Sequence, residues 1–284
     1  MQGSREGGRR GARGKRLAAL GVAMAVSVSA CGVSQQQEVE MGQQESAQVQ
    51  QQLPLVQDPV INQYVSSLGN QIAQHTSRSD LQWQFYVVNT DVVNAFALPG
   101  GIVYVNRGVL ERADKMDELA GVLGHEIEHV VRRHSVKQME QMQGANIGVA
   151  LGCALTNICS NQAAAAAINI GGTAVFAKFS RADEVQADEG GFQNVMNAGI
   201  SPEGMLTFFQ KLLAEEQQGG NSAVNSWFSD HPGTQDRIAD IQRMLAQVPQ
   251  SQLRNLTTDT PAFQAMKRRV MSLPPAPKQS ANLR

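Results

Sequence analysis

A five-residue stretch, His125-Glu126-Ile127-Glu128-His129, constrains the fold of this chain more than any other part of its sequence. Residues i and i+4 of an α-helix share one face, so the two imidazoles can bind one metal ion if this stretch is helical. Glu126 then lies about 100° round the helix, where it can act as a general base on a water molecule. Apolar residues recur at helical spacing here and predict a helix across residues 110–131. They are Leu110, Met116, Leu119, Val122, Leu123, Ile127, Val130 and Val131.

Two histidines on the apolar side of a helix are buried polar groups, and a metal ion is one of the few partners that satisfies both. A catalytic zinc site has three protein ligands, so a third must come from elsewhere. His134 lies nine residues after His125, on the opposite side of a continuous helix. We therefore predict that His134 lies at the surface, or contacts a ligand without binding the metal itself.

The segment from Ser180 to Asp188 offers a third ligand. Ser180 is a candidate N-cap, with Asp183 three residues later as in a capping box, and Glu184 and Asp188 share a helix face. Glu184 can then bind zinc, while Asp188 accepts a hydrogen bond from a ligand imidazole and fixes its tautomer. The alternative is that these acidic residues only stabilise the start of a helix.

These motifs resemble those of the CaaX-prenyl-endopeptidase family of zinc metallopeptidases, in particular its bacterial periplasmic HtpX-like and LoiP-like lipoprotein branch. The resemblance covers about residues 58–245. It implies a gluzincin in which His125, His129 and Glu184 bind one Zn²⁺ and Glu126 is the general base. The motifs that carry it are His125-Glu126-x-x-His129, Ser180-Arg181-x-x-Glu184-x-x-Ala187-Asp188, the segment Asn94 to Gly101, and the weaker His231-Pro232 with Arg237.

His231 and Arg237 are assigned to the active site on this resemblance. Either side chain can donate a hydrogen bond to the oxyanion that develops during peptide hydrolysis. His231 can instead be a fourth zinc ligand that closes the resting site. A purely structural role for His231 is the third alternative.

The predicted fold class is α+β and mainly helical: a zincin-like metalloprotease fold with a small β-sheet. Residues Pro59–Gln74 and Thr234–Leu245 predict amphipathic helices, while Leu81–Val88 and Ile102–Val105 predict strands on either side of a Pro-Gly-Gly turn. The chain near Asn94, Ala95 and Phe96 is predicted to pair with an extended substrate through main-chain hydrogen bonds. Such pairing discriminates little between side chains and suits unfolded polypeptides.

The N-terminus resembles an export signal. Residues 1–16 contain six Lys and Arg residues, residues 17–30 are apolar or small, and Cys31 follows a lipobox-like sequence. We expect a lipoprotein signal peptide over 1–30 and a lipid on Cys31; the alternative is an ordinary cleaved signal. The predicted organisation continues with a flexible Gln-rich tether over 31–57, a peptidase domain over 58–250 and a Pro-rich C-terminal extension over 251–284.

Charge and cysteine content narrow the possible partners. The signal segment holds six of the 24 basic residues and one of the 25 acidic residues, so the remainder carries a net charge of −6. This balance does not favour nucleic acid. With Cys31 lipidated, Cys153 and Cys159 remain as a possible disulfide or as two free thiols. Residues 144–176, rich in Gly and Ala, are predicted to form small-residue helices or a flap.

The predicted function is a membrane-anchored, zinc-dependent endopeptidase that cleaves unfolded or misassembled proteins of the bacterial envelope. Its expected location is the periplasmic side of the outer membrane, because Gly32 after the lipidated cysteine is uncharged. The competing hypothesis is a zinc-containing chaperone or assembly factor that holds envelope proteins without cutting them. A metal-free lipoprotein scaffold would leave both histidine and glutamate motifs unexplained.

Overall fold

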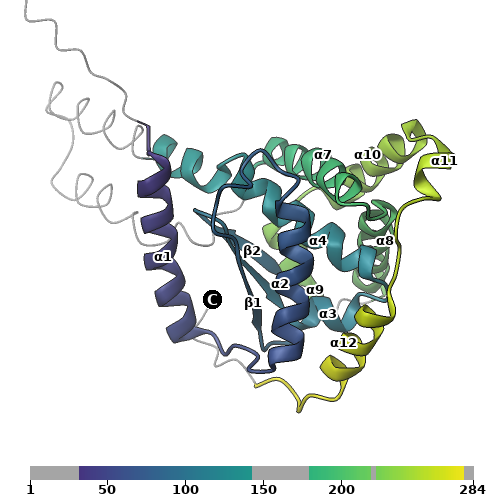
Figure 1. Cartoon of the computed structure of the whole chain (residues 1–284), viewed down its shortest axis with the longest axis horizontal. Coiled ribbons are helices and arrows are strands. Elements are labelled where there is room, and N and C mark those ends of the chain that lie inside the picture. The colour runs from purple at the N-terminus through teal and green to yellow at the C-terminus, as the bar shows by residue number, and fades with distance from the viewer. Residues whose placement is uncertain (1–31, 143–178, 219–221, 278–284) are drawn as a thin grey trace, which may run out of the picture. The chain divides into compact units, whose positions relative to one another are not determined.

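The computed structural model describes residues 32–142, 179–218 and 222–277. Figure 1 shows helices arranged around a three-stranded sheet. The helices are α1 (Gln35–Gln52), α2 (Pro59–Ala73), α3 (Arg107–Arg112), α4 (Met116–Val131), α7 (Arg181–Asn197), α8 (Glu203–Gln217), α9 (Ser222–Asp230), α10 (Thr234–Gln247), α11 (Gln250–Leu253) and α12 (Pro261–Met271). The strands are β1 (Gln84–Val88), β2 (Ala95–Leu98) and β3 (Ile102–Asn106). The predicted class, α+β with helices dominating, is confirmed.

The sheet has the order β1-β3-β2. β1 runs parallel to β3, with Tyr86 opposite Tyr104, and β2 runs antiparallel to β3, with Ala97 opposite Val103. The Pro-Gly-Gly sequence predicted as a turn joins β2 to β3. β2 is therefore an edge strand, and no other described strand pairs with its outer side.

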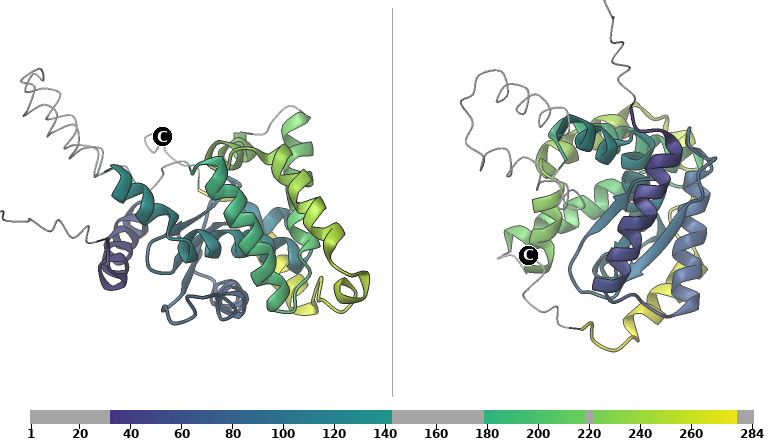
Figure 2. Two further views of the ribbon diagram at one scale, coloured as in Figure 1. Left: turned by 90° about the horizontal axis from the view of Figure 1, so that it is seen from above. Right: turned by 90° about the vertical axis from the view of Figure 1, so that its left-hand side faces the viewer.

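Each face of the sheet is covered by different helices. One face contributes alternating side chains such as Phe85, Val87 and Val103 to the main core, which includes α2 and α4. The other face presents Leu98, Ile102 and Tyr104 to a smaller cluster that contains Val49 of α1. Figure 2 shows α1 lying along this second face. Burial of alternate residues on both faces explains why β3 is buried at every position.

Residues 35–52, predicted as part of a flexible tether, form helix α1. The side chain of Ser34 accepts a hydrogen bond from the main-chain amide of Gln37, and the side chain of Gln37 accepts one from the main-chain amide of Ser34, so the helix begins with a capping box. Gly42 packs against the turn after β2 so closely that an added Cβ would lie 1.8 Å from the carbonyl oxygen of Pro99. Tertiary contacts thus order a segment whose polar composition predicted disorder.

The helix predicted across residues 110–131 is divided in two. α3 ends at Arg112, the chain is extended at Ala113, and α4 begins at Met116. Side chains satisfy the main-chain groups exposed by this break: Glu118 accepts a hydrogen bond from the amide of Asp114 at 2.6 Å, and Lys267 donates one to the carbonyl of Ala113 at 2.6 Å.

Several predicted features lie outside the described residues. These are the signal peptide over 1–30, Cys31, the Gly- and Ala-rich segment 144–176, and the pair Cys153 and Cys159. Among the helices that the structure describes, none is both long and apolar enough to cross a membrane.

Candidate metal centre

The predicted helix α4 carries both histidines into the interior of the molecule. His125 and His129 are 0% and 1% exposed, and their Nε2 atoms lie 3.0 Å apart. Every residue of α4 from Met116 to Val130 is buried, because the sheet and α2 pack on one side of the helix and α7 and α8 on the other. The two ring nitrogens are therefore held facing each other away from solvent.

Close packing of α7 on α4 brings in the predicted third ligand. The helices cross at Gly124 and Gly191, where a Cβ on Gly191 would lie 2.9 Å from the carbonyl carbon of Gly124. This contact places Oε2 of Glu184 3.4 Å from Nε2 of His125 and Oε1 3.6 Å from Nε2 of His129. Glu184 is fully buried. Ser180 caps α7 through the predicted capping box, which sets where this helix begins.

His231 completes the group from the end of α9. Its Nδ1 lies 3.2 Å from Oε2 of Glu184 and 3.3 Å from Nε2 of His125. The ring packs 4.5 Å from the indole of Trp227, and the main-chain amide of His231 donates a hydrogen bond to the carbonyl of Trp227. His125, His129, Glu184 and His231 form a set that we call the metal group, whose ligand atoms all lie within 4.8 Å of one another.

Asp188 and Arg237 support the side of the metal group that contains His125. Oδ1 of Asp188 lies 2.9 Å from Nδ1 of His125, and Arg237 donates two hydrogen bonds to Asp188, at 2.6 and 2.7 Å. Arg237 also lies 2.8 Å from Oε2 of Glu184, and its guanidinium covers the ring of Phe209. The arginine, predicted to contact the reacting oxyanion, is thus placed behind the ligands as a partner of two carboxylates.

Glu126 lies beside the metal group but makes no hydrogen bond to it. Both of its carboxylate oxygens are buried without a hydrogen-bond partner among the described residues. Nε2 of His231 lies 3.6 Å from Oε1 of Glu126. Burial raises the pKa of Glu126, since desolvation penalises the ionised form. This arrangement suits a group that accepts and later releases a proton.

The other acidic residues are held in their charged forms. Burial alone would raise the pKa of Glu184, but His231 and His125 outweigh it and hold that pKa well below its usual range. Burial alone would also raise the pKa of Asp188, but the charge and hydrogen bonds of Arg237 outweigh it and lower that pKa. Burial, with the nearby His125, keeps the pKa of His129 well below its usual value. A neutral imidazole beside carboxylates is the donor set that zinc prefers.

The residues present fit a zinc ion. The Nε2 atoms of His125 and His129 lie 3.0 Å apart and both face the carboxylate of Glu184, whose Oε1 has no hydrogen-bond partner among the described residues. A cation held between them would satisfy all three atoms. Nitrogen and carboxylate donors, with an acceptor behind His125, are typical of zinc sites.

His134 does not lie at the surface; it takes the other predicted position, in contact with a ligand of the metal group. It is 2% exposed, and its Nδ1 lies 2.9 Å from Nδ1 of His129. The prediction of a position on the far side of α4 failed because the helix ends at Val131. Arg133 then adopts a left-handed conformation with φ of 58°, and the following helical residues turn His134 back towards the centre. A sequence pattern contains no signal for that turn at an arginine.

The predicted substrate strand approaches the centre through Asn94. The side chain of Asn94 donates a hydrogen bond to Asp230, the residue before His231, at 2.8 Å. Asn106 donates a main-chain hydrogen bond to Asn94, so in the antiparallel register the main-chain groups of Ala97 point to the outer side of β2. Ala95 and Ala97 face α4, and Phe96 faces α1.

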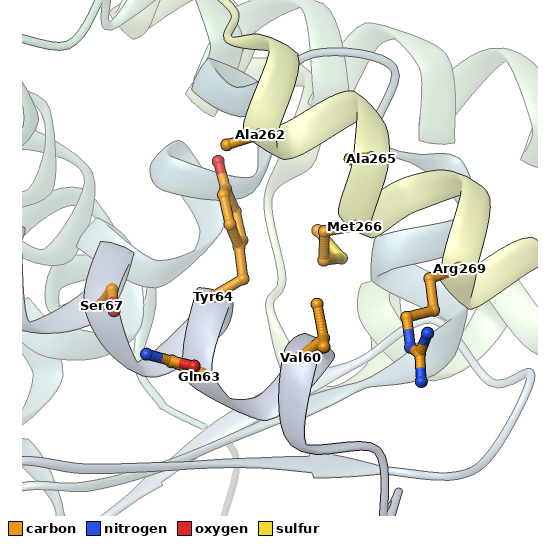
Figure 3. Close-up of a pocket in the computed structure, with 8 residues that line it drawn as sticks. All are labelled: Val60, Gln63, Tyr64, Ser67, Ala262, Ala265, Met266 and Arg269. Carbon is orange, nitrogen blue, oxygen red and sulfur yellow. The ribbon is translucent and has the colours of Figure 1, made fainter.

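A separate groove, with a cavity volume of about 570 Å³, lies between α2 and α12. Figure 3 shows Val60 and Tyr64 of α2 facing Ala265, Met266 and Arg269 of α12. None of the predicted site residues lines this groove, which is mostly apolar. The predicted catalytic and metal-binding side chains lie in or beside the metal group instead. Cys31, Cys153 and Cys159 lie outside the described residues.

Comparisons with known proteins agree with this geometry. The model of peptidase family M48 matches residues 59–245. The chain is 33% identical over 219 residues to the beta-barrel assembly-enhancing protease of Escherichia coli (strain K12), covering 75% of this chain and 44% of that protein. It is 33% identical over 196 residues to the mitochondrial metalloendopeptidase OMA1 of Schizosaccharomyces pombe, covering 69% of this chain and 56% of that protein. It is 28% identical over 178 residues to the Escherichia coli metalloprotease LoiP, covering 63% of this chain and 68% of that protein.

Proposed function

This chain belongs to peptidase family M48, a family of zinc metalloendopeptidases, and we propose that it cleaves unfolded or misassembled polypeptides of the bacterial cell envelope. The observation that carries the proposal is the buried metal group with Glu126 unpaired beside it. The matched region spans 44% of the length of the Escherichia coli beta-barrel assembly-enhancing protease, so the substrate is proposed from the site and from family membership together.

Glu126 is the residue that we assign to proton transfer. Its carboxylate takes a proton from the attacking water and delivers it to the nitrogen of the leaving amine. The absence of competing hydrogen bonds from described residues leaves both oxygens available for that task. Bound zinc would supply Lewis-acid polarisation of the scissile carbonyl.

The other residues hold this arrangement in place. His125, His129 and Glu184 would hold the ion, with Asp188 orienting His125 and Arg237 pairing with both carboxylates. His231 is the fourth member of the group, and we assign it to closing the centre at rest. Its Nδ1 lies 3.2 Å from Oε2 of Glu184 and 3.3 Å from Nε2 of His125, a position that suits a fourth ligand.

The edge strand β2 is the proposed site of substrate binding. An extended polypeptide can pair with the main-chain groups of Ala97, and β2 packs directly on the metal helix α4. Main-chain pairing recognises a substrate that is locally extended, whatever its side chains. This property supports unfolded polypeptides as the substrate class.

The alternative function is a zinc-containing chaperone or assembly factor. One observation favours it: the metal group contains four protein residues, as in closed structural zinc sites. The decisive experiment is cleavage of casein by the purified chain, with and without chelator, beside the variants Glu126→Gln and Glu128→Gln. The second variant is the matched control, because Glu128 pairs with Arg132 and Asn194 outside the metal group.

A protease requires zinc-dependent cleavage that is lost by at least about 10²-fold in Glu126→Gln, with zinc retained, and is kept in Glu128→Gln. Equal cleavage by wild type and Glu126→Gln would remove the peptidase assignment. Zinc binding without cleavage in the wild type would favour the chaperone.

We also propose that a lipid on Cys31 anchors the protein at the periplasmic face of the outer membrane. The support is the lipobox-like sequence before Cys31 and the uncharged Gly32 after it. Cys31→Ser should move the protein from the membrane to the soluble periplasmic fraction. Mass spectrometry that finds an unmodified Cys31 at the mature N-terminus would reject the anchor.

A further inference from the structure

His134 is buried against a proposed zinc ligand and has no part in the mechanism described above. We propose that His134 is a positioning residue that accepts a hydrogen bond from Nδ1 of His129 and thereby fixes the tautomer and orientation of this ligand. The inference rests on the proposed zinc centre. It adds a hydrogen-bonded chain that runs from α4 through His134 to Gln186 of α7.

The roles of the ring nitrogens follow from geometry. Nε2 of His129 faces the metal group, 3.0 Å from Nε2 of His125 and 3.6 Å from Glu184. For Nε2 to offer a lone pair to a cation, the proton of a neutral His129 must lie on Nδ1. The atom 2.9 Å from Nδ1 is Nδ1 of His134, which must therefore be unprotonated and act as the acceptor.

This assignment also determines which atom of His134 carries the proton. A neutral imidazole with an unprotonated Nδ1 carries its proton on Nε2. That atom lies 3.4 Å from Oε1 of Gln186 and 3.6 Å from Oδ1 of Asp183, both on α7 and both acceptors. Each polar atom in this hydrogen-bonded series of side chains then has either a donor or an acceptor as its partner. The chain ends on residues that flank Glu184, so it ties one ligand's orientation to the helix that carries another.

Apolar packing restricts His129 to this partner. The ring of Phe179 stacks on His129 with centroids 4.0 Å apart, and it lies 5.9 Å from His134. One face of the ligand imidazole is thereby covered. Because His134 is 2% exposed, water has little access to compete for Nδ1 of His129.

The backbone turn before His134 makes the contact possible. Arg133 has a φ of 58°, a conformation that a residue with a Cβ seldom adopts. Its side chain is held by Glu38 of α1, with Nε 2.8 Å from Oε2, and it donates to the carbonyl of Val33. Glu38 is itself fully buried and also pairs with Arg78. Helix α1 thus holds the turn that directs His134 to His129.

The test is the zinc dissociation constant of the purified chain, measured by competition with a chelator for wild type, His134→Leu, His134→Asn and His134→Gln. Asn places its amide oxygen where Nδ1 of histidine lies, whereas Gln places its amide near the position of Nε2. We expect zinc affinity to fall by 10- to 100-fold in the Leu and Gln variants and by no more than about threefold in Asn. His75→Ala, at an exposed histidine, is the matched control and should bind like wild type.

Two results would overturn the proposal. The first is zinc binding by His134→Leu within about twofold of wild type, which would show that the ligand needs no acceptor here. The second is an Asn variant as weak as Leu, which would reduce His134 to a core-filling residue. A wild-type chain that binds zinc but cleaves no polypeptide would instead defeat the proposed function, while the affinity ratios would still decide the role of His134.

Discussion

The two histidines of α4 are supported in different ways on the two sides of the metal group. Behind His125 lies a charged pair, Asp188 and Arg237, whose atoms approach to 2.6 Å. Behind His129 lies the imidazole of His134, followed by the amide of Gln186. One ligand is therefore oriented by a carboxylate that an arginine neutralises, and the other by a chain of groups that we assign as neutral.

The difference has an energetic consequence. A buried ion pair tolerates the loss of one partner poorly, because the remaining charge stays in a medium of low polarity. Loss of a neutral hydrogen-bond partner leaves only an unsatisfied polar atom, which costs less. The side of His125 should therefore contribute to folding as well as to metal binding, whereas the side of His129 should matter mainly for the metal.

The largest expected effect tests the charged side. Asp188→Asn removes a charge from beside Arg237, which is 2% exposed and keeps only Glu184 as a charged partner within 4 Å among the described residues. We expect the free energy of unfolding of the metal-free chain to fall by about 3 kcal/mol. Urea denaturation followed by circular dichroism measures this change.

The loss of stability in Asp188→Asn is compared with the losses in two other variants. His134→Leu should cost only about 1–2 kcal/mol of stability, since no charge is stranded. Asp236→Asn, at an exposed residue paired with exposed Arg181, should leave stability unchanged. Equal losses for Asp188→Asn and His134→Leu would show that the contrast between charged and neutral support is wrong.

The second prediction concerns His231, which lies between the two sides. If His231 closes the centre at rest, His231→Ala should open a position and increase casein cleavage or self-cleavage several-fold. If it stabilises the oxyanion instead, the same change should lower kcat by about 10²-fold with zinc retained. Its position within the metal group, 3.3 Å from His125, favours the increase.

The readouts for His231→Ala are kcat on casein and zinc content. His75→Ala controls for the loss of a histidine as such. Unchanged kinetics and unchanged zinc affinity would reject both roles and leave His231 as a packing partner of Trp227.

The asymmetry also shows what the sequence could predict. Four residues of the site are encoded in local spacing: His125 and His129 lie four residues apart on α4, and Glu184 and Asp188 lie four residues apart on α7. Helical periodicity alone brings each pair to one face. The motifs that carry these residues also led to the family, which the match over residues 59–245 confirms.

The neutral side depends on tertiary contacts that no local pattern records. His134 reaches His129 only because Arg133 adopts a left-handed conformation, and that conformation is supported from residue 38, far away in the sequence. The segment that forms α1 has a polar composition, which predicts a flexible tether. Its order comes instead from Glu38 and from contacts with the sheet. Contacts between residues that are far apart in the sequence cannot be predicted from periodicity and composition.

The smallest expected effect isolates this turn. Arg133→Gly and Arg133→Ala both remove the contacts to Glu38 and Val33, but glycine adopts a φ of 58° freely, whereas alanine bears a penalty of about 1 kcal/mol. If the turn directs His134, Arg133→Ala should bind zinc about three- to fivefold more weakly than Arg133→Gly, as measured by chelator competition. In a His134→Leu background the two Arg133 variants should bind zinc equally, because the turn then has no acceptor to position. A difference of the same size in both backgrounds would mean that the turn acts on the centre by another route, and His129 would not depend on α1 through His134.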